Sequence, residues 1–335
     1  MLHYLLRRLG FIGVMLGGIM ALTFLLSRVL PGDPARLLAG PRASAETVAR
    51  VREIHGLDLP LWEQFLAYCG RLLTGDLGNS IVTNRPVLED IARFFPATLE
   101  LVIATLLLAT LLGVAIGLVS AIRKGGKIDT TGRFVAIGAL SLPDFWIAIL
   151  AQLLFFSVLS ILPFGGRLPT GMAAPEAVTG LMTVDALLAG RLDQFGLALK
   201  HLLMPACVLA LPSMGLLARI VRATALEVLG QDYVRTAHAK GIRPLRLYLR
   251  HVLKNALLPV VTFLGLLFGF LLSGAVLVEL VFAWPGIGRY TASAISATDY
   301  NAIMGVTIVV STAYLLINFV VDLLYTRIDP RVRLS

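Results

Sequence analysis

Six stretches of this chain are long and apolar enough to cross a lipid bilayer, and this feature restricts the chain to the folds that a membrane allows. About 20 apolar residues span the hydrocarbon core as a helix, and a backbone inside lipid must satisfy its own hydrogen bonds. Of the residues, 57% are hydrophobic and 15% are charged, whereas soluble domains carry about 25% charged residues. The sequence therefore predicts an all-α polytopic membrane protein with six transmembrane helices. The six stretches are residues 9–30, 101–122, 134–162, 202–218, 256–282 and 302–321.

The distribution of Lys and Arg predicts which loops face the cytoplasm, because short cytoplasmic loops retain positive charge. Cations exceed anions before the first stretch, at Arg7 and Arg8, and in segments 123–133, 219–254 and 327–335. An even number of spans places both ends of the chain on the same side of the membrane. We therefore expect both termini and these segments in the cytoplasm.

The remaining loops divide the chain into regions. The first apolar stretch is longer than the apolar core of a secretory signal peptide, and Pro31-Gly32-Asp33-Pro34 follows it in place of a cleavage site. We therefore expect it to remain as a membrane anchor. The polar segment after it is long enough to form a small subdomain of its own. The expected regions are an N-terminal transmembrane helix at 1–30, an extracytoplasmic helical subdomain at 31–98, a five-helix core at 99–326 with an outer loop at 163–200 and a cytoplasmic loop at 219–255, and a cytoplasmic tail at 327–335. The outer loop is expected to be irregular, although a short helix near residues 183–189 is the alternative.

Residues 226–259 form a polar segment between two apolar stretches. Asp232 can cap the N-terminus of a helix over residues 233–240, and Gly241 can end that helix in a left-handed turn without a Cβ clash. Pro244 suits the first turn of a second helix. The segment therefore predicts a short helix pair beside the membrane.

The second helix of this pair is expected to be amphipathic, because spacings of three and four residues place like side chains on one stripe. Two interpretations are open: a helix in the headgroup layer whose cations meet anionic lipids, or a docking surface for a soluble partner. The cationic stripe consists of Arg243, Arg246, Arg250 and Lys254, and the adjacent apolar stripe consists of Leu245, Leu249 and Leu253.

The tract Arg235-Thr236-Ala237, with Gly241 four positions after its last residue, resembles the cytoplasmic loop signature of binding-protein-dependent ABC importer permeases. The chain departs from the general signature at Arg235, His251 and Lys254, and these departures resemble the peptide and nickel branch of that family. The chain is similar to the first, or B-type, permease subunit of this branch. The stretches that carry the resemblance, in order along the chain, are residues 30–34, 56–58, 75–80, 232–237, 239–241, 255–259, 284–290 and 329–331.

The resemblance implies a type I ABC importer permease fold and a transport function. It implies that this chain and a second, homologous permease form the pathway as a heterodimer, that two cytoplasmic ATPases drive alternating access, and that an extracytoplasmic substrate-binding protein delivers the substrate. Di- and oligopeptides are the first substrates that it implies, with nickel, glutathione and glycosides as alternatives. It implies the cytoplasmic membrane of a bacterium or archaeon. The residues that it assigns to the ATPase contact are Asp232, Tyr233, Arg235, Thr236, Ala237, Ala239, Lys240 and Gly241.

No segment predicts enzyme chemistry in this chain itself. The sequence contains no GxxxxGK[ST] phosphate loop, so ATP and magnesium are expected on partner subunits and no cofactor on this chain. Its five histidines show no metal-binding spacing, and no feature indicates binding to nucleic acid. An ion-coupled secondary transporter is the alternative class, although the internal repeat typical of such carriers is not evident.

Acidic residues within the apolar stretches are candidates for function, because a charge at the centre of a transmembrane helix costs about 2.5 to 3.5 kcal/mol. Asp144 follows Pro143, which can kink the third stretch. Its carboxylate could meet a cationic substrate or pair with the sibling subunit. Glu279, near the outer end of the fifth stretch, is expected either in an outer gate or in an ion pair with Arg289.

Other side chains in and beside the apolar stretches predict packing or anchoring. Trp284 and Tyr290 are expected to anchor at the membrane interface. Cys69 and Cys207 fall in an outer loop and a span, so no disulfide is expected between them. Small residues four positions apart allow close helix approach; the pairs are Gly13 and Gly17, Gly113 and Gly117, and Gly265 and Gly269.

Overall fold

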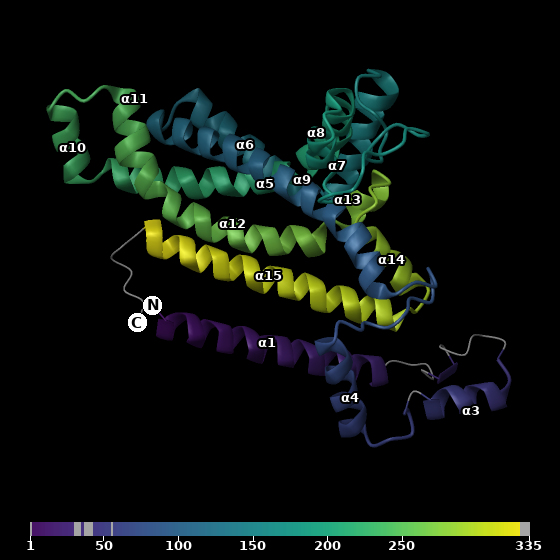
Figure 1. Ribbon diagram of the computed structural model, residues 1–335. Coiled ribbons are helices and arrows are strands. Elements are labelled where there is room, and N and C mark those ends of the chain that lie inside the picture. The colour runs from purple at the N-terminus through teal and green to yellow at the C-terminus, as the bar shows by residue number, and fades with distance from the viewer. Residues whose placement is uncertain (1, 30–34, 37–42, 55, 329–335) are drawn as a thin grey trace. The chain divides into compact units, whose positions relative to one another are not determined.

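The structure is a computed structural model that describes residues 2–29, 35–36, 43–54 and 56–328 (Figure 1). Pro31 to Pro34 and the stretch at 329–331, both used above, lie outside the described residues. Within these residues the regular elements are helical, and an isolated bridge between extended residues joins Asn79 and Pro86. The helices are α1 (Leu2–Val29), α3 (Ala45–Ile54), α4 (Leu61–Leu73), α5 (Val87–Ile122), α6 (Lys127–Ser141), α7 (Asp144–Ala151), the π-helical η1 (Gln152–Val158), α8 (Met182–Leu188), α9 (Leu192–Leu229), α10 (Asp232–Ala239), α11 (Pro244–Leu247), the π-helical η2 (Tyr248–Leu253), α12 (Lys254–Gly274), α13 (Val276–Val281), α14 (Ile287–Ser296) and α15 (Tyr300–Ile328).

Four of these helices contain segments long and apolar enough to cross a membrane, and two bent pairs bring the number to six if each pair is one span. The pair at residues 127–158 bends by 103° and the pair at 244–274 by 51°. The four single segments are Leu6–Arg28, Val87–Ile122, Leu192–Leu229 and Tyr300–Leu324.

The sharper bend lies at Pro143, inside the third predicted stretch. Leu142, just before it, is extended, with φ −104° and ψ 135°. A proline ring disfavours helical geometry in the preceding residue and has no N–H for the helix ladder. The expected kink is therefore a break between two helices, and Asp144 begins the second of them, α7.

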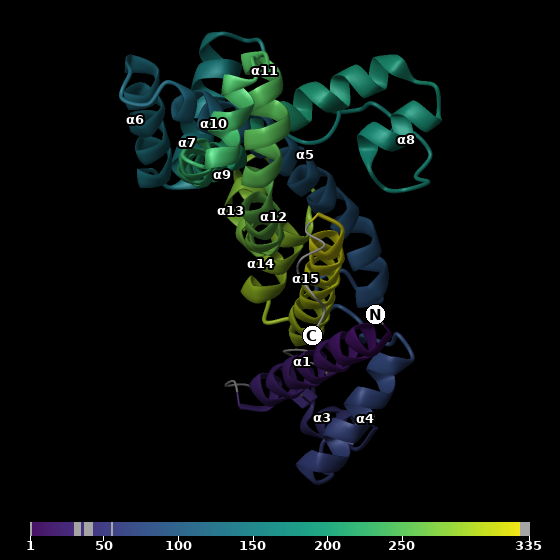
Figure 2. The ribbon, with the colours of Figure 1, turned by 90° about the vertical axis from the view of Figure 1, so that its left-hand side faces the viewer.

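The chain forms two compact units, each described here by itself. The first consists of residues 1–94 and 290–315. In it α4 packs on α1 (Figure 2). The rings of Phe24 and Phe65 lie 5.4 Å apart, and the Tyr68 hydroxyl lies 3.2 Å from Thr23 Oγ1. The buried carboxylate of Asp299 accepts hydrogen bonds from Ser80 Oγ and Ile81 N at 2.6 and 2.7 Å. These bonds fix the loop after α4 to the start of α15.

The second unit, residues 95–289 and 316–335, is built around α9, which packs against α6, α7, α8 and α12. Helix α5 also approaches α9 closely. A Cβ added at Gly113 would lie 3.0 Å from Met214 O, and one added at Gly117 would lie 2.6 Å from Ala218 O. This confirms the close approach predicted for these two glycines. At Gly13 and Gly17 a Cβ would meet no described atom within 4 Å.

A buried ion pair joins α6 to α9 in the second unit. The Arg222 guanidinium donates two hydrogen bonds to the Asp129 carboxylate, from Nε at 2.7 Å and from Nη2 at 2.8 Å. A two-bond arginine–carboxylate contact fixes orientation as well as distance. It therefore holds the first half of the bent pair at 127–158 against α9.

Candidate functional site

The first candidate is the polar segment after α9, where α10 forms with slightly different ends from those predicted. Gln231 caps the helix, without a side-chain hydrogen bond, and Asp232 is its first residue. An acidic residue in the first turn still interacts favourably with the helix dipole. Gly241 adopts φ +74° and its N–H donates to His238 O at 3.0 Å. This confirms the predicted left-handed turn at that position.

One face of α10 is packed against the chain itself. Val234 is 4% exposed and Ala237 is 8% exposed. Both belong to an apolar cluster with side chains of α9 and α12, among them Val221 and Val260. Burying a valine side chain stabilises a fold by about 1.5 to 3 kcal/mol. The side chain of Ala237, assigned above to the ATPase contact, therefore helps to hold α10 in place and does not lie on its outer face.

The other face of α10 is exposed and carries the remaining predicted contact residues. Arg235 and Asp232 keep most of their side-chain surface open, at 77% and 98%, and their nearest charged atoms are 3.9 Å apart. A surface pair at this distance contributes little to stability, so both charges are available to a partner. The exposed residues are Asp232, Tyr233, Arg235, Thr236, Ala239, Lys240 and Gly241. We call this set the outer face of α10.

Two of the tracts that carry the family resemblance touch one another here. Asn255 Nδ2 donates to the Tyr233 hydroxyl at 2.9 Å and to His251 O at 2.8 Å. Asn255 is near the start of α12 and Tyr233 is in the first turn of α10. The bond links the short helix directly to α12, in the bent pair that follows it.

The helix after α10 begins at Pro244, as predicted, but its packed face differs from the predicted apolar stripe. Leu245 is 71% and Leu249 49% exposed, whereas Leu247 and Val252 are 3% and 0% exposed. The reason is the π-helical turn over Tyr248–Leu253, in which residues five apart, not four, share a face. The predicted cations remain exposed, with Arg243 as N-cap of α11. The others are Arg246, Arg250 and Lys254.

Asp144, the second candidate, begins α7 at the 103° break. It is half-buried, and among the described residues its side chain makes no hydrogen bond or ion pair. A carboxylate in that position can still accept a cationic partner from outside the chain.

Glu279, the third candidate, is completely buried in α13. Its Oε1 accepts a hydrogen bond from Thr98 Oγ1 at 2.5 Å, and its Oε2 accepts one from the Arg289 backbone N–H at 2.9 Å. This hydrogen bond to Arg289 comes from its backbone N–H, so the ion pair with its guanidinium stays a prediction. Thr98 Oγ1 in turn accepts from Ile287 N at 2.8 Å. The carboxylate organises the turn between α13 and α14.

The same turn corrects the prediction for Trp284 and Tyr290. Their side chains are 1% and 5% exposed, so they are packed inside the protein and are not interface anchors. Trp284 Nε1 donates to Ala97 O at 2.8 Å, and the Tyr290 ring stacks on Phe94 at 5.2 Å. Aromatic residues suit both a membrane interface and a protein interior. The contacts with α5 show that these two residues lie in the interior.

A buried ion pair in the outer loop was missed by reasoning from sequence. Arg167 Nη2 donates to Glu100 Oε2 at 2.5 Å and to Gly180 O at 2.9 Å. The other oxygen of Glu100 accepts from the N–H and hydroxyl of Thr183, both at 2.7 Å. These bonds tie the loop to α5. The loop includes the short helix α8, whereas the sequence favoured an irregular loop and left a helix near residues 183–189 only as the alternative. A charge at the end of an apolar stretch was the available signal.

Within the part of the chain that the structure describes, no group of three or more His, Cys, Asp or Glu side chains is arranged to hold a metal ion. Cys69 and Cys207 are both free thiols. Burial raises the pKa of the Cys69 thiol, so it is less reactive than an ordinary cysteine.

Comparison with known proteins places these features in a family. Residues 113–334 match the model described as "Binding-protein-dependent transport system inner membrane component", and residues 1–102 match the model of its N-terminal region. The "Probable D,D-dipeptide transport system permease protein" of Escherichia coli (strain K12) is 49% identical over 95% of this chain and 94% of its own length. The dipeptide transport system permease protein of Alkalihalophilus pseudofirmus is 41% identical, over 99% of this chain and 100% of its own length. The glutathione transport system permease protein of Salmonella choleraesuis (strain SC-B67) is 40% identical over 99% of both chains.

Proposed function

The chain belongs to the binding-protein-dependent transport system inner membrane component family, and we propose that it is one of two membrane-spanning subunits of a bacterial or archaeal ABC importer for di- and oligopeptides. The second subunit would be a homologous permease, and a substrate-binding protein would deliver the peptide from outside. The observation that carries the proposal is α10, a short helix packed to the chain on one face and free on the other. Such a helix can transmit a movement of a bound partner to the rest of the chain.

The proposed topology has six spans, with each bent pair as one span and both termini in the cytoplasm, in a type I permease fold. Arg7 and Arg8 lie in the first turn of the first span, and exposed cations lie on α10 and α11. Positive charge is retained on the cytoplasmic side, which supports this orientation. The outer face of α10 would then lie in the cytoplasm.

On this proposal the outer face of α10 binds an ATPase subunit, and ATP and magnesium bind to that partner. Arg235 and Lys240 supply cations for acidic groups, and Thr236 and Ala239 allow close approach because they are small. Gly241 turns the chain so that α11 leads into the membrane. Closure of two ATPases would move α10, and α10 would move the bent pair after it through Val234 and Asn255. These contacts would couple ATPase closure to the change between inward-facing and outward-facing states.

Peptide is the proposed substrate because two of the relatives described above are named dipeptide permeases. Asp144 suits this substrate, since an uncompensated carboxylate at a helix break can receive a peptide's amino group. Glu279 would act at the outer side by holding the turn between α13 and α14 rigid. A glutathione importer is the second candidate, supported by the relative named for it.

Purification of the tagged chain from native membranes in mild detergent, followed by mass spectrometry of what accompanies it, tests the proposal. We expect a second permease of the same family and ATPase subunits. Membrane vesicles that contain the assembly should take up a labelled dipeptide when ATP is supplied. A chain that purifies alone or only with copies of itself, even after crosslinking, would contradict the proposal and favour an ion-coupled carrier.

A further inference from the structure

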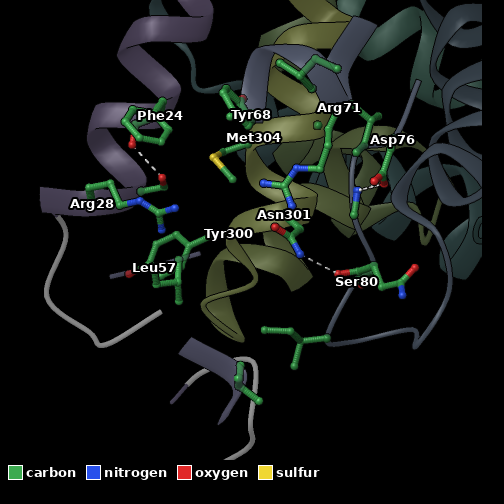
Figure 3. A pocket seen from close by; sticks show the side chains of 18 of the residues that line it. Phe24, Arg28, Leu57, Tyr68, Arg71, Asp76, Ser80, Tyr300, Asn301 and Met304 are labelled. Carbon is green, nitrogen blue, oxygen red and sulfur yellow. Dashed lines mark hydrogen bonds between the residues drawn. The ribbon is translucent and has the colours of Figure 1, made fainter. Parts of the chain in front are cut away.

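A cavity of about 630 Å³ lies in the first compact unit, outside the sites described above. Its walls come from the end of α1, from α4, from the loop at residues 76–81 and from the start of α15 (Figure 3). Ligand sites in proteins typically measure about 300 to 1,000 Å³, so the cavity is large enough for a small group.

Two arginines give this cavity its chemistry. Figure 3 shows the guanidinium groups of Arg28, from α1, and Arg71, from α4, turned into the same space. Among the described residues neither side chain makes an ion pair or hydrogen bond, and Arg28 Nε is buried without a partner. The ring of Phe24 lies 5.2 Å from the Arg28 guanidinium. Two cations that face one cavity repel each other, and an anion between them would be attracted by both.

Two of the other polar side chains on the wall, those of Asp76 and Asn301, are already engaged. Asp76, the one acidic residue among the described lining residues, accepts a hydrogen bond from Gly78 N at 2.9 Å. Asn301 Nδ2 donates to Asn79 O at 3.0 Å. Among the described lining residues, the wall therefore carries one excess positive charge. Its two guanidinium groups make no ion pair or hydrogen bond with these residues. Guanidinium groups match the oxygens of a phosphate group.

The position of the cavity identifies the kind of phosphate. Arg28 is the last residue of the membrane-spanning segment of α1, and Tyr300 is the first of that of α15. The ends of spanning helices lie at the level of lipid headgroups. Next to Arg28 along α1, Leu22, Leu25 and Leu26 are exposed and can lie against acyl chains. The cations thus stand where headgroup phosphates are present, above an apolar helix surface.

We propose that this cavity binds the phosphate of an anionic phospholipid between Arg28 and Arg71. The lipid would bridge α1 and α4 and would neutralise two cations that have no ion-pair partner among the described residues. Its binding does not depend on the peptide substrate or on the ATPase contact, and a failure of either proposal leaves the other standing.

The test uses the chain with all subunits that purify with it, stripped of lipid in detergent and then incubated with phosphatidylglycerol. Native mass spectrometry would measure retained lipid for the wild type and for R28Q/R71Q. Because a charged hydrogen bond contributes about 1.5 to 3 kcal/mol, we expect the double variant to bind this lipid at least about tenfold more weakly. R50Q is the matched control, since it removes an exposed cation of α3 outside the cavity. R71K should retain part of the binding.

Three results would overturn the proposal. The first is equal retention of phosphatidylglycerol by the wild type and R28Q/R71Q. The second is stabilisation of the wild type, but not of R28Q/R71Q, by inorganic phosphate to an extent that phosphatidylglycerol does not exceed. This result would assign the cavity to a soluble anion. The third is a lower unfolding temperature of R28Q/R71Q in lipid-free detergent, because the arginines would then serve the fold and not a ligand.

Discussion

At the scale of single residues, Glu279 shows how a buried charge can organise a turn. Its two oxygens accept hydrogen bonds from Thr98 and from the backbone of Arg289, which come from distant parts of the chain. The turn passes so close that a Cβ at Gly286 would lie 2.2 Å from Oε1. A buried carboxylate is tolerated only when such donors surround it. Position 286 therefore has to be glycine, because a larger residue would collide with the carboxylate.

Replacement of Gly286 by alanine should therefore be destabilising, because either the carboxylate or the backbone must move and lose hydrogen bonds. Loss of one buried bond to a charged group costs about 1.5 to 3 kcal/mol. The unfolding temperature of purified G286A should fall accordingly. G138A is the control, because Gly138 lies in α6 with no described atom within 4 Å of an added Cβ. Equal unfolding temperatures for the two variants would contradict this account of Glu279.

At the scale of elements, helices in this chain are positioned by contacts that local sequence patterns do not reveal. The apolar runs predicted which segments are helical, and Gly113 and Gly117 predicted a close helix approach on α5, but not that its partner is α9. The side chains of α11 and η2 that pack inward could not be read from the apolar stripe, because periodicity assumes α-helical spacing and Tyr248–Leu253 is π-helical. The burial of Trp284 could not be predicted either, since its partner Ala97 lies 187 residues earlier.

The packed face of α11 can be tested with two leucines of the same short helix. L247A should destabilise the protein by about 2 to 5 kcal/mol, because it opens a cavity in the cluster beneath α10. L245A removes an exposed side chain and should change stability by no more than about 0.5 kcal/mol. Chemical denaturation in detergent compares the two. A larger effect of L245A would restore the stripe predicted from sequence.

The ion pair of the outer loop predicts a local effect. R167Q leaves the buried Glu100 carboxylate without its cation, and breaking a buried pair costs about 3 to 5 kcal/mol. We expect the loop at residues 163–200 to become sensitive to proteases that are added from its exposed side. R191Q removes an exposed cation of the same loop and should leave it resistant. Equal cleavage of both variants would show that the pair does not hold the loop.

At the scale of the whole molecule, the chain combines helices that can span a membrane with α10, a short helix that is fixed on one face and that we propose lies in the cytoplasm. The family and the position of this helix could be inferred from residues 232–241, because their order and spacing are specific. The bend of 103° at Pro143 could not, since a proline permits a range of bends and neighbouring helices select one. The sequence also did not predict which residues of α10 are buried. The structure shows that Val234 and Ala237 are buried and that Arg235 and Lys240 are exposed.

The central claim is that the outer face of α10 is the ATPase contact, and charge reversal tests it most directly. R235E/K240E should purify with its partner permease but with at least about tenfold less ATPase subunit, because each lost charged hydrogen bond contributes about 1.5 to 3 kcal/mol. K124E, which reverses an exposed cation between α5 and α6, should retain the ATPase as the wild type does. Quantitative mass spectrometry of the three purified assemblies gives the answer. If R235E/K240E keeps the full complement of ATPase, α10 is not the contact and the account is wrong.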